Sequence, residues 1–286
     1  MELKKLFEYI IAKRKKYEDK TVFQTLKDHT LEVFKAAQKI ASESKETGTY
    51  SKEDLLIAAL LHDLGKISQK FQLEIIRSEE DRKKLPQKFK DFLNKDTSKI
   101  KDHEILSHLW SIGLEEILGR ERASSIRAAI LLHHRNQLWE NFDYIEYFNV
   151  WTEIGSMFFG QNAKNYVNYL EFLSQNRNLL SEYVTNLIQD AINKCNLELL
   201  RKIKEYYSLD GNFWKNIELF MEEFKRSGDI AHLYELPSLR KKKDVEKFLA
   251  FLGALNRADY FGSALFEDKS LPTDVLGYSL KELGNY

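Results

Sequence analysis

The chain has few of the residues that interrupt or cross-link a fold. Its 286 residues include a single cysteine, Cys195, three prolines and twelve glycines. One cysteine excludes an intramolecular disulfide framework and fits a reducing compartment. Proline and glycine break helices, and both are scarce here, whereas Lys, Glu, Leu and Ile are plentiful. This composition favours long helices. We therefore predict an all-α fold.

Two further absences narrow the possible functions. The 44 basic and 44 acidic residues cancel, so the chain has no overall attraction to polyanions. Nucleic-acid binding would have to come from local patches or from a partner. No apolar run approaches the roughly 18 residues that a membrane span needs, and no extended apolar segment opens the chain. We expect a soluble, cytoplasmic protein with no membrane partner.

A run of seven apolar residues, Leu55–Leu61, predicts a helix that is buried on every side. His62 and Asp63 follow it directly, although both are unfavourable in an apolar interior. Imidazole nitrogen and carboxylate oxygen suit a divalent cation, and one carboxylate can bridge two cations. The alternative is an ordinary helix end, at which His62 and Asp63 satisfy carbonyls and Gly65 stops the helix.

Other metal-competent side chains lie on predicted helices. His29 is one, although a single histidine is more often a packing or surface residue. A second buried run, Ile126–Leu132, ends in His133 and His134 and repeats the design of the first. Asp259 interrupts the apolar face of a C-terminal helix, where a carboxylate is costly unless it is paired with a cation or metal.

Two more histidines share one predicted helix that begins at Asp102. His103 and His108 are five residues apart, which places them about 140° apart around the helix. We expect only one of them to be a ligand. A further histidine, His232, stands alone in a predicted loop and is expected not to be a ligand.

Two segments are expected to face solvent. Residues 3–17 alternate apolar and basic residues and predict an amphipathic first helix, with the basic run Lys13–Lys16 on its solvated face. Residues 78–101 are charged and loosely patterned, which predicts an excursion with a short helix near Phe89–Leu93. The lysines of this excursion would suit phosphates if they bordered the site: Lys83, Lys84, Lys88 and Lys90.

Four motifs together carry a family resemblance. They are His62-Asp63-Leu64-Gly65-Lys66 with Phe71-Gln72, then Asp102-His103-Glu104, then His133-His134, then Ala258-Asp259-Tyr260-Phe261-Gly262-Ser263. They resemble the HD superfamily of metal-dependent phosphohydrolases and, within it, the HD nuclease of type I CRISPR interference. That nuclease is half of the helicase-nuclease that degrades target DNA. The likeness covers residues 22–135 and 244–266.

The resemblance implies a helical bundle around a buried, dinuclear metal site. One metal would be held by His29, His62, Asp63 and Asp259, and the second by Asp63, His103, His133 and His134. Asp63 would bridge the two metals, and Lys66 would face the scissile phosphate. His108 has no counterpart in this pattern. Imidazole-rich ligands favour Mn, Fe, Co or Ni, with Mg also possible.

The resemblance also implies an organisation and an activity. Residues 1–286 would be one HD nuclease domain, with a ligand-bearing core at 22–135 and 244–266 and a helical insertion at about 137–243. The activity would be metal-dependent hydrolysis of phosphodiester bonds in single-stranded DNA, as an endonuclease of antiviral defence. The chain contains no Walker A motif, so the helicase is expected on a separate subunit, working with an RNA-guided effector complex.

Two other functions stay open at this point. One is an HD phosphohydrolase that acts on small nucleotides, which would have a closed pocket with a base-specific wall. The other is a non-catalytic HD module of a larger assembly, or the detached nuclease domain of a type III effector's large subunit. The complete ligand set argues against an inactive module. Trp139 and Tyr144 are candidates for base stacking, with core packing as the alternative.

Overall fold

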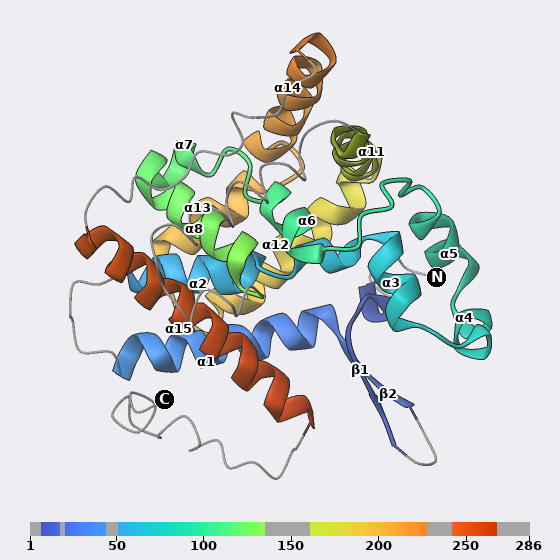
Figure 1. Cartoon of the computed structure of the whole chain (residues 1–286), viewed down its shortest axis with the longest axis horizontal. Coiled ribbons are helices and arrows are strands. Elements are labelled where there is room, and N and C mark those ends of the chain that lie inside the picture. Colours follow the sequence, from blue (N-terminus) through green and yellow to red (C-terminus); the bar gives the residue numbers. More distant parts are fainter. Residues whose placement is uncertain (1–6, 18–20, 44–50, 135–160, 228–241, 268–286) are drawn as a thin grey trace.

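A computed structural model describes residues 7–17, 21–43, 51–134, 161–227 and 242–267 (Figure 1). Most of these residues are helical, which confirms the predicted all-α class. The candidate ligands lie on or beside α1 (Leu26–Glu43), α2 (Lys52–Leu61), α6 (His103–Leu109), α8 (Arg120–Leu132) and α15 (Lys242–Glu267). None of the helices in the described ranges is long and apolar enough to cross a membrane.

Helix α2 lies at the centre of the bundle. It contacts α1, α8 and α15, and α1 also packs along α15 (Figure 1). All seven residues of Leu55–Leu61 are buried, as their unbroken apolar sequence predicts. Arg122, near the start of α8, donates from Nη2 to Oδ1 of Asp54 at 2.6 Å and so joins the starts of α8 and α2. The ends of these two helices therefore reach the same region of the molecule.

The prediction of an amphipathic helix over residues 3–17 is wrong. After a short 3-10 helix, η2 (Phe7–Tyr9), the chain forms strand β1 (Ile11–Lys16), which pairs antiparallel with β2 (Thr21–Thr25). The strand is also held by a side chain. Ile11 N–H donates to Oε1 of Gln72 at 3.0 Å, and its carbonyl accepts from Nε2 of Gln72 at 2.8 Å. Tertiary partners of this kind override local helical periodicity.

Part of the predicted excursion at residues 78–101 is folded against the body of the protein. It forms α4 (Glu79–Lys84) and α5 (Gln87–Leu93), and α5 corresponds to the expected short helix. The prediction of a solvent-facing segment holds for α4, which has no buried residue. It is wrong for α5, because Phe89, Phe92 and Leu93, spaced i, i+3 and i+4, make a buried apolar stripe. The lysines of this segment lie on α4 and α5, at the right-hand edge of Figure 1.

The helices of the predicted insertion support the segment that follows α6. They are α11 (Gln161–Gln175), α12 (Arg177–Ile192), α13 (Glu198–Tyr206) and α14 (Asn212–Ser227). Nε1 of Trp110 donates to the Tyr169 hydroxyl at 3.1 Å, and its ring stacks on Phe213 at 5.3 Å. The Tyr206 hydroxyl donates to the Ile112 carbonyl at 2.5 Å. This aromatic cluster holds the chain directly after α6 in place.

Three short elements adjoin α2 and α8 along the chain. The 3-10 helix η3 (Leu64–Ile67) follows α2 directly, and α3 (Gln69–Ile75) follows η3. Helix α7 (Glu115–Leu118) precedes α8. The Ser68 hydroxyl accepts from Phe71 N–H and caps α3.

Candidate metal centre

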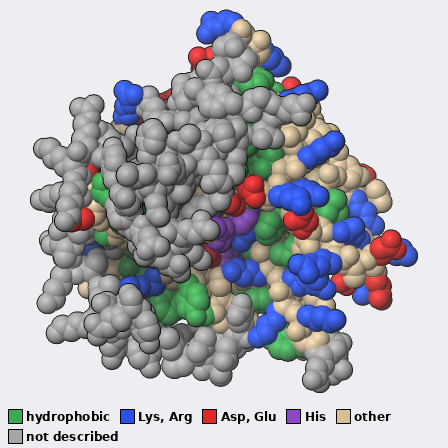
Figure 2. Space-filling model, in the orientation of Figure 1, with side chains coloured by type: hydrophobic (Ala, Val, Ile, Leu, Met, Phe, Trp, Pro, Cys, Tyr) green, Lys and Arg blue, Asp and Glu red, His purple; other side chains and the backbone are tan. Residues whose placement is uncertain are grey.

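The structure brings together the seven residues that the sequence predicts as ligands. They come from five elements: His29 from α1, His62 and Asp63 after α2, His103 from α6, His133 and His134 after α8, and Asp259 from α15. Figure 2 shows histidine side chains in a hollow on one face of the molecule, with basic side chains alongside. The bundle thus converges on one cluster that can be reached from this face.

Two helix ends orient their histidines in the same way. Nδ1 of His62 lies 2.9 Å from the Ala59 carbonyl, and Nδ1 of His133 lies 2.5 Å from the Ile130 carbonyl. A carbonyl only accepts, so each Nδ1 carries the proton and each Nε2 keeps its lone pair. Such second contacts fix the tautomer and direction of a metal-binding histidine. At the ends of both α2 and α8, the first histidine is therefore held by a carbonyl of its own helix with Nε2 free to bind a metal.

One group of potential ligand atoms surrounds Oδ2 of Asp63. Nε2 of His29 lies 2.9 Å from this oxygen and 3.1 Å from Oδ1 of Asp259. Nε2 of His62 lies 3.4 Å and 3.8 Å from the same two oxygens. One ligand atom from each of the four residues falls within 4.8 Å of the others.

The second group faces the other oxygen of the same carboxylate. Oδ1 of Asp63 lies 3.2 Å from Nε2 of His103 and 3.8 Å from Nε2 of His133. Nε2 of His134 lies 3.0 Å from Nε2 of His103. Each oxygen of Asp63 thus belongs to a different histidine group, which is the arrangement that a bridging carboxylate requires.

Unsatisfied polar atoms provide a test of whether the cluster fits a metal. Five buried atoms of the cluster residues have no hydrogen-bond partner: Nδ1 of His29 and four potential ligand atoms, which are Nε2 of His29, His62 and His133 and Oδ1 of Asp63. A buried polar atom without a partner costs about 1–3 kcal/mol, so four in one place are unfavourable in a purely structural cluster. The four potential ligand atoms lie close together without hydrogen-bond geometry. Divalent cations would satisfy them, and the residues therefore fit metal ions.

The charges of the cluster also suit a cation. Burial opposes ionisation of Asp63, but His62 and Lys66 outweigh it and hold the pKa of this carboxyl well below its usual range. The neighbouring His29 and His62 lower the pKa of Asp259 in the same way, against its burial. Both carboxylates are therefore ionised at neutral pH.

Two imidazoles of the second group are held neutral. Burial lowers the pKa of His103 to about 4. Desolvation, followed by the neighbouring His133 and His103, lowers the pKa of His134 to about 2, although part of its surface is exposed. Neutral imidazole is the form that binds metal, so an incoming ion would displace no proton from these rings at neutral pH.

Lys66 is buried at the centre of the cluster, with 5% of its surface exposed. Its Nζ lies 2.6 Å from Oδ2 of Asp63 and 5.5 Å from the ring centroid of Phe71. The same ring meets His103 edge-on, with centroids 5.1 Å apart. Lys66 is therefore an interior residue and not a surface residue that interacts only with the carbonyls at the end of α2. The ring of Phe71 contacts both Lys66 and His103 and so helps to position them.

Phe71 and Gln72 belong to the motif that begins at His62-Asp63, and the sequence alone assigns them no contact. Gln72 donates from Nε2 to the Lys66 carbonyl at 2.7 Å as well as to Ile11. It therefore ties strand β1 to the residue that contacts Asp63. The motif spacing was the available signal, but the spacing alone does not reveal which groups these side chains contact.

His108, which the family resemblance does not include among the ligands, lies outside the cluster. His108 is buried, and its Nδ1 lies 3.3 Å from the Arg127 carbonyl, outside both ligand groups. The prediction that His103 and His108 face different directions is confirmed. His232, Trp139 and Tyr144 lie outside the described residues.

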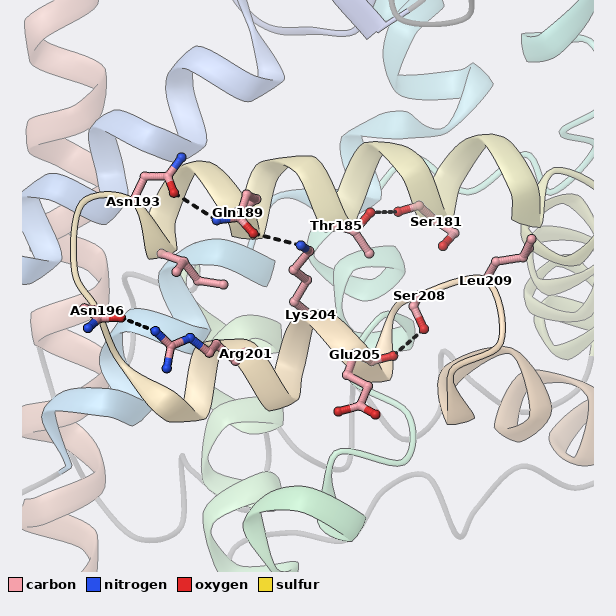
Figure 3. A pocket seen from close by; sticks show the side chains of 11 residues that line it. Ser181, Thr185, Gln189, Asn193, Asn196, Arg201, Lys204, Glu205, Ser208 and Leu209 are labelled. Atoms are coloured by element: carbon pink, nitrogen blue, oxygen red, sulfur yellow. Dashed lines mark hydrogen bonds between the residues drawn. The ribbon is translucent and has the colours of Figure 1, made fainter.

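A polar groove between α12 and α13 carries none of this chemistry (Figure 3). No histidine is among the described residues that line it, and several of its side chains bond to one another. Nζ of Lys204 donates to Oε1 of Gln189 at 2.8 Å, and Nε2 of Gln189 donates to Oδ1 of Asn193 at 2.9 Å. The groove is a satisfied helix–helix surface, so the His/Asp cluster is the candidate site.

Comparison with known proteins agrees with this geometry. A family model described as the HD domain matches residues 26–164. Just under half of the chain is therefore similar to the HD domain. The matched HD residues include six of the seven clustered side chains, and Asp259 joins them from α15, outside the match. Together with the buried His/Asp groups, the HD domain indicates a metal-dependent hydrolase of the HD type.

A curated relative extends the likeness. The chain is 28% identical over 216 residues to the CRISPR-associated nuclease/helicase Cas3 of Methanothermobacter thermautotrophicus (strain Delta H). The match covers 73% of this chain but only 24% of that protein. No solved structure matches the chain.

Proposed function

We propose that this protein is a metal-dependent nuclease that hydrolyses phosphodiester bonds of single-stranded DNA. The observation that carries the proposal is the placement of Asp63, whose two oxygens face two separate histidine groups. Ions bound in both groups would share the carboxylate, and paired ions of this kind are a recurrent device for phosphodiester hydrolysis. Its biological setting would be type I CRISPR interference, together with a helicase and an RNA-guided effector complex.

The protein residues would supply the frame for this chemistry. Two divalent ions bound here would polarise the phosphodiester and lower the pKa of a water molecule. Asp63 and Asp259 contribute the negative charge that holds cations, and the carbonyl-fixed His62 and His133 present Nε2 in set directions. Burial lowers the local dielectric constant, which strengthens each of these interactions.

Lys66 is the residue proposed to act on the phosphate. Its ammonium lies at the bridging carboxylate and close to both ligand groups. Negative charge on the phosphoryl oxygens rises in the transition state, so a fixed ammonium there would favour the transition state over the ground state. Asp63 and Lys66 are therefore the proposed catalytic residues, with the histidines and Asp259 as proposed ligands.

The matched relative is a CRISPR-associated nuclease/helicase, which supports DNA as the substrate of this protein. The aligned part is about a quarter of that protein. In this chain it overlaps the region that matches the HD domain. Histidine-rich ligand groups favour Mn, Fe, Co or Ni, with Mg also possible.

The test combines metal analysis with digestion. The purified protein is analysed for bound metals and then incubated with labelled single-stranded and duplex DNA in Mn, Co, Ni or Mg. We expect cleavage of the single strand and resistance of the intact duplex, with Asp63→Asn inactive. Rapid hydrolysis of deoxynucleoside triphosphates with no action on DNA would instead identify a small-nucleotide phosphohydrolase. Metal binding without either activity would identify a non-catalytic module.

A further inference from the structure

A basic β-hairpin projects from the start of α1, the helix that carries His29 (Figure 1). The run Lys13–Lys16, which the sequence alone predicts as a plain solvated face, makes up most of strand β1. The partner strand, β2, carries no charged residue. Since the whole chain has a net charge of zero, this strand concentrates positive charge in one place.

The hairpin is joined to the helix that carries Asp259. Nζ of Lys13 donates to Oγ of Ser263, and Oγ of Ser263 donates to the Asp259 carbonyl at 2.6 Å. Ser263 is one helical turn from Asp259. The basic strand therefore begins within one turn of a residue that belongs to the first ligand group.

Two exposed aromatic side chains flank this junction. Four large apolar side chains are exposed among the described residues: Tyr17, Leu209, Leu219 and Tyr260. The two aromatic ones are Tyr17, 42% exposed at the end of the basic strand, and Tyr260, 70% exposed directly after Asp259. Tyr260 and Ser263 are three residues apart on α15, so they are neighbours on its surface. Tyr260 thus lies on α15 next to Asp259 in sequence and one turn from the serine that bonds to the hairpin.

We propose that Lys15, Lys16, Tyr17 and Tyr260 form a surface that holds single-stranded nucleic acid beside the metal centre. We call these four residues the hairpin surface. The lysines would contact phosphates and the two tyrosines would stack on bases. This inference rests on the proposed function and specifies how the strand reaches the site.

The physical chemistry of single-strand binding matches these residues. Proteins that hold a single strand combine positive side chains along the backbone with aromatic rings under the bases. Nζ of Lys15 lies 5.0 Å from the ring centroid of Tyr17, so a charge and a stacking surface adjoin. A strand rises about 3.3 Å per residue, so the stretch from Lys13 to Tyr17 spans about 13 Å. That length suits contact with more than one nucleotide.

Binding measurements on matched variants test the inference. Fluorescence anisotropy of a labelled single-stranded oligonucleotide is recorded in chelator, so that the strand is not cut, at several salt concentrations. Lys15→Ala/Lys16→Ala should reduce the slope of log K against log salt by about 1.4, because each phosphate contact to a single strand contributes about 0.7. Tyr260→Ala should weaken binding about tenfold, and Tyr260→Phe should bind like the parent because the ring remains.

The control variants lie on α14, at the top of Figure 1 and far from the hairpin. Lys225→Ala/Arg226→Ala removes the same charge from exposed positions, and Leu219→Ala removes an exposed apolar side chain. Both should bind the oligonucleotide like the parent. Equal losses of affinity and salt slope in the α14 and hairpin variants would overturn the inference, since binding would then depend only on total charge.

Two outcomes separate this inference from the proposed function. If the parent cuts single-stranded DNA but Lys15→Ala/Lys16→Ala and Tyr260→Ala bind it as tightly as the parent, the hairpin surface is refuted and the nuclease function stands. If the parent neither binds nor cuts DNA and consumes nucleotides instead, both fail. Metal content and thermal melting of each variant confirm that a loss of binding does not reflect unfolding.

Discussion

Nζ of Lys66 lies 2.6 Å from Oδ2 of Asp63, and both side chains are buried. The same oxygen faces His29 at 2.9 Å, while Oδ1 faces His103 at 3.2 Å. One carboxylate is therefore shared by an ammonium and two histidine groups. Removing either side chain leaves the charge of the other unpaired in the interior. Substitutions of Lys66 and of Asp63 nevertheless have different expected effects, because only Asp63 is a proposed metal ligand.

Lys66→Ala should slow the reaction without removing metal. The carboxylates and histidines remain, so metal content should equal that of the parent. Losing one contact that favours the transition state should lower turnover about 10²-fold. Single-turnover cleavage at saturating enzyme measures this step, and Lys66→Met provides a variant that keeps the length of the side chain. A variant as fast as the parent would leave Lys66 with a structural role only.

Asp63→Ala should remove metal from both groups, because Asp63 is the residue that the two groups share. Cleavage should be lost while the helical circular dichroism signal stays close to that of the parent. Asp63→Asn preserves the volume and removes the charge, so it separates loss of ligation from loss of packing. Retention of two equivalents of metal in either variant would contradict the bridging role.

His103→Ala and His108→Ala form a matched pair on one helix. His103 belongs to a ligand group, whereas Nδ1 of His108 faces the Arg127 carbonyl. Metal content and cleavage should fall in His103→Ala and stay near the parent in His108→Ala. Both variants lose a buried or half-buried ring, so thermal melting reports packing loss separately. The reverse order of metal loss would show that His108 is the ligand.

Gly65→Ala should disturb the second ligand group through packing. A Cβ at this position would lie 2.0 Å from the His103 carbonyl oxygen and 2.5 Å from the Ser107 nitrogen. Backbone atoms cannot move aside cheaply, so we expect a destabilisation of about 1–3 kcal/mol and a lower metal content. Thermal melting and metal analysis measure the two effects.

Gly119→Ala is the control for this substitution. Its φ of 77° makes any side chain strained, but nothing lies within 4 Å of the new Cβ. It should lower the melting temperature and leave the metal content unchanged. If Gly65→Ala also retained its full metal content, the close approach of η3 and α6 would not be needed for the site.

The helix ends that carry ligands could be predicted from the sequence because the signal is local. An unbroken apolar run such as Leu55–Leu61 identifies a buried helix in any fold, and the polar residues that follow it must find partners. The spacing of His103 and His108 likewise follows from helical geometry alone. The helical spacing of the apolar residues around Asp259 likewise shows, from the sequence alone, that an ionisable side chain interrupts an apolar face.

Tertiary structure decided the contacts that join distant segments. Residues 11–16 form a strand and not a helix because the side chain of Gln72 and strand β2 satisfy its backbone, and sequence periodicity contains no information on these partners. The burial of Lys66 depends on Phe71 and Asp63 in the same way. Chain composition and period fix which faces are apolar, whereas the direction of each polar atom depends on the neighbours that packing brings to it.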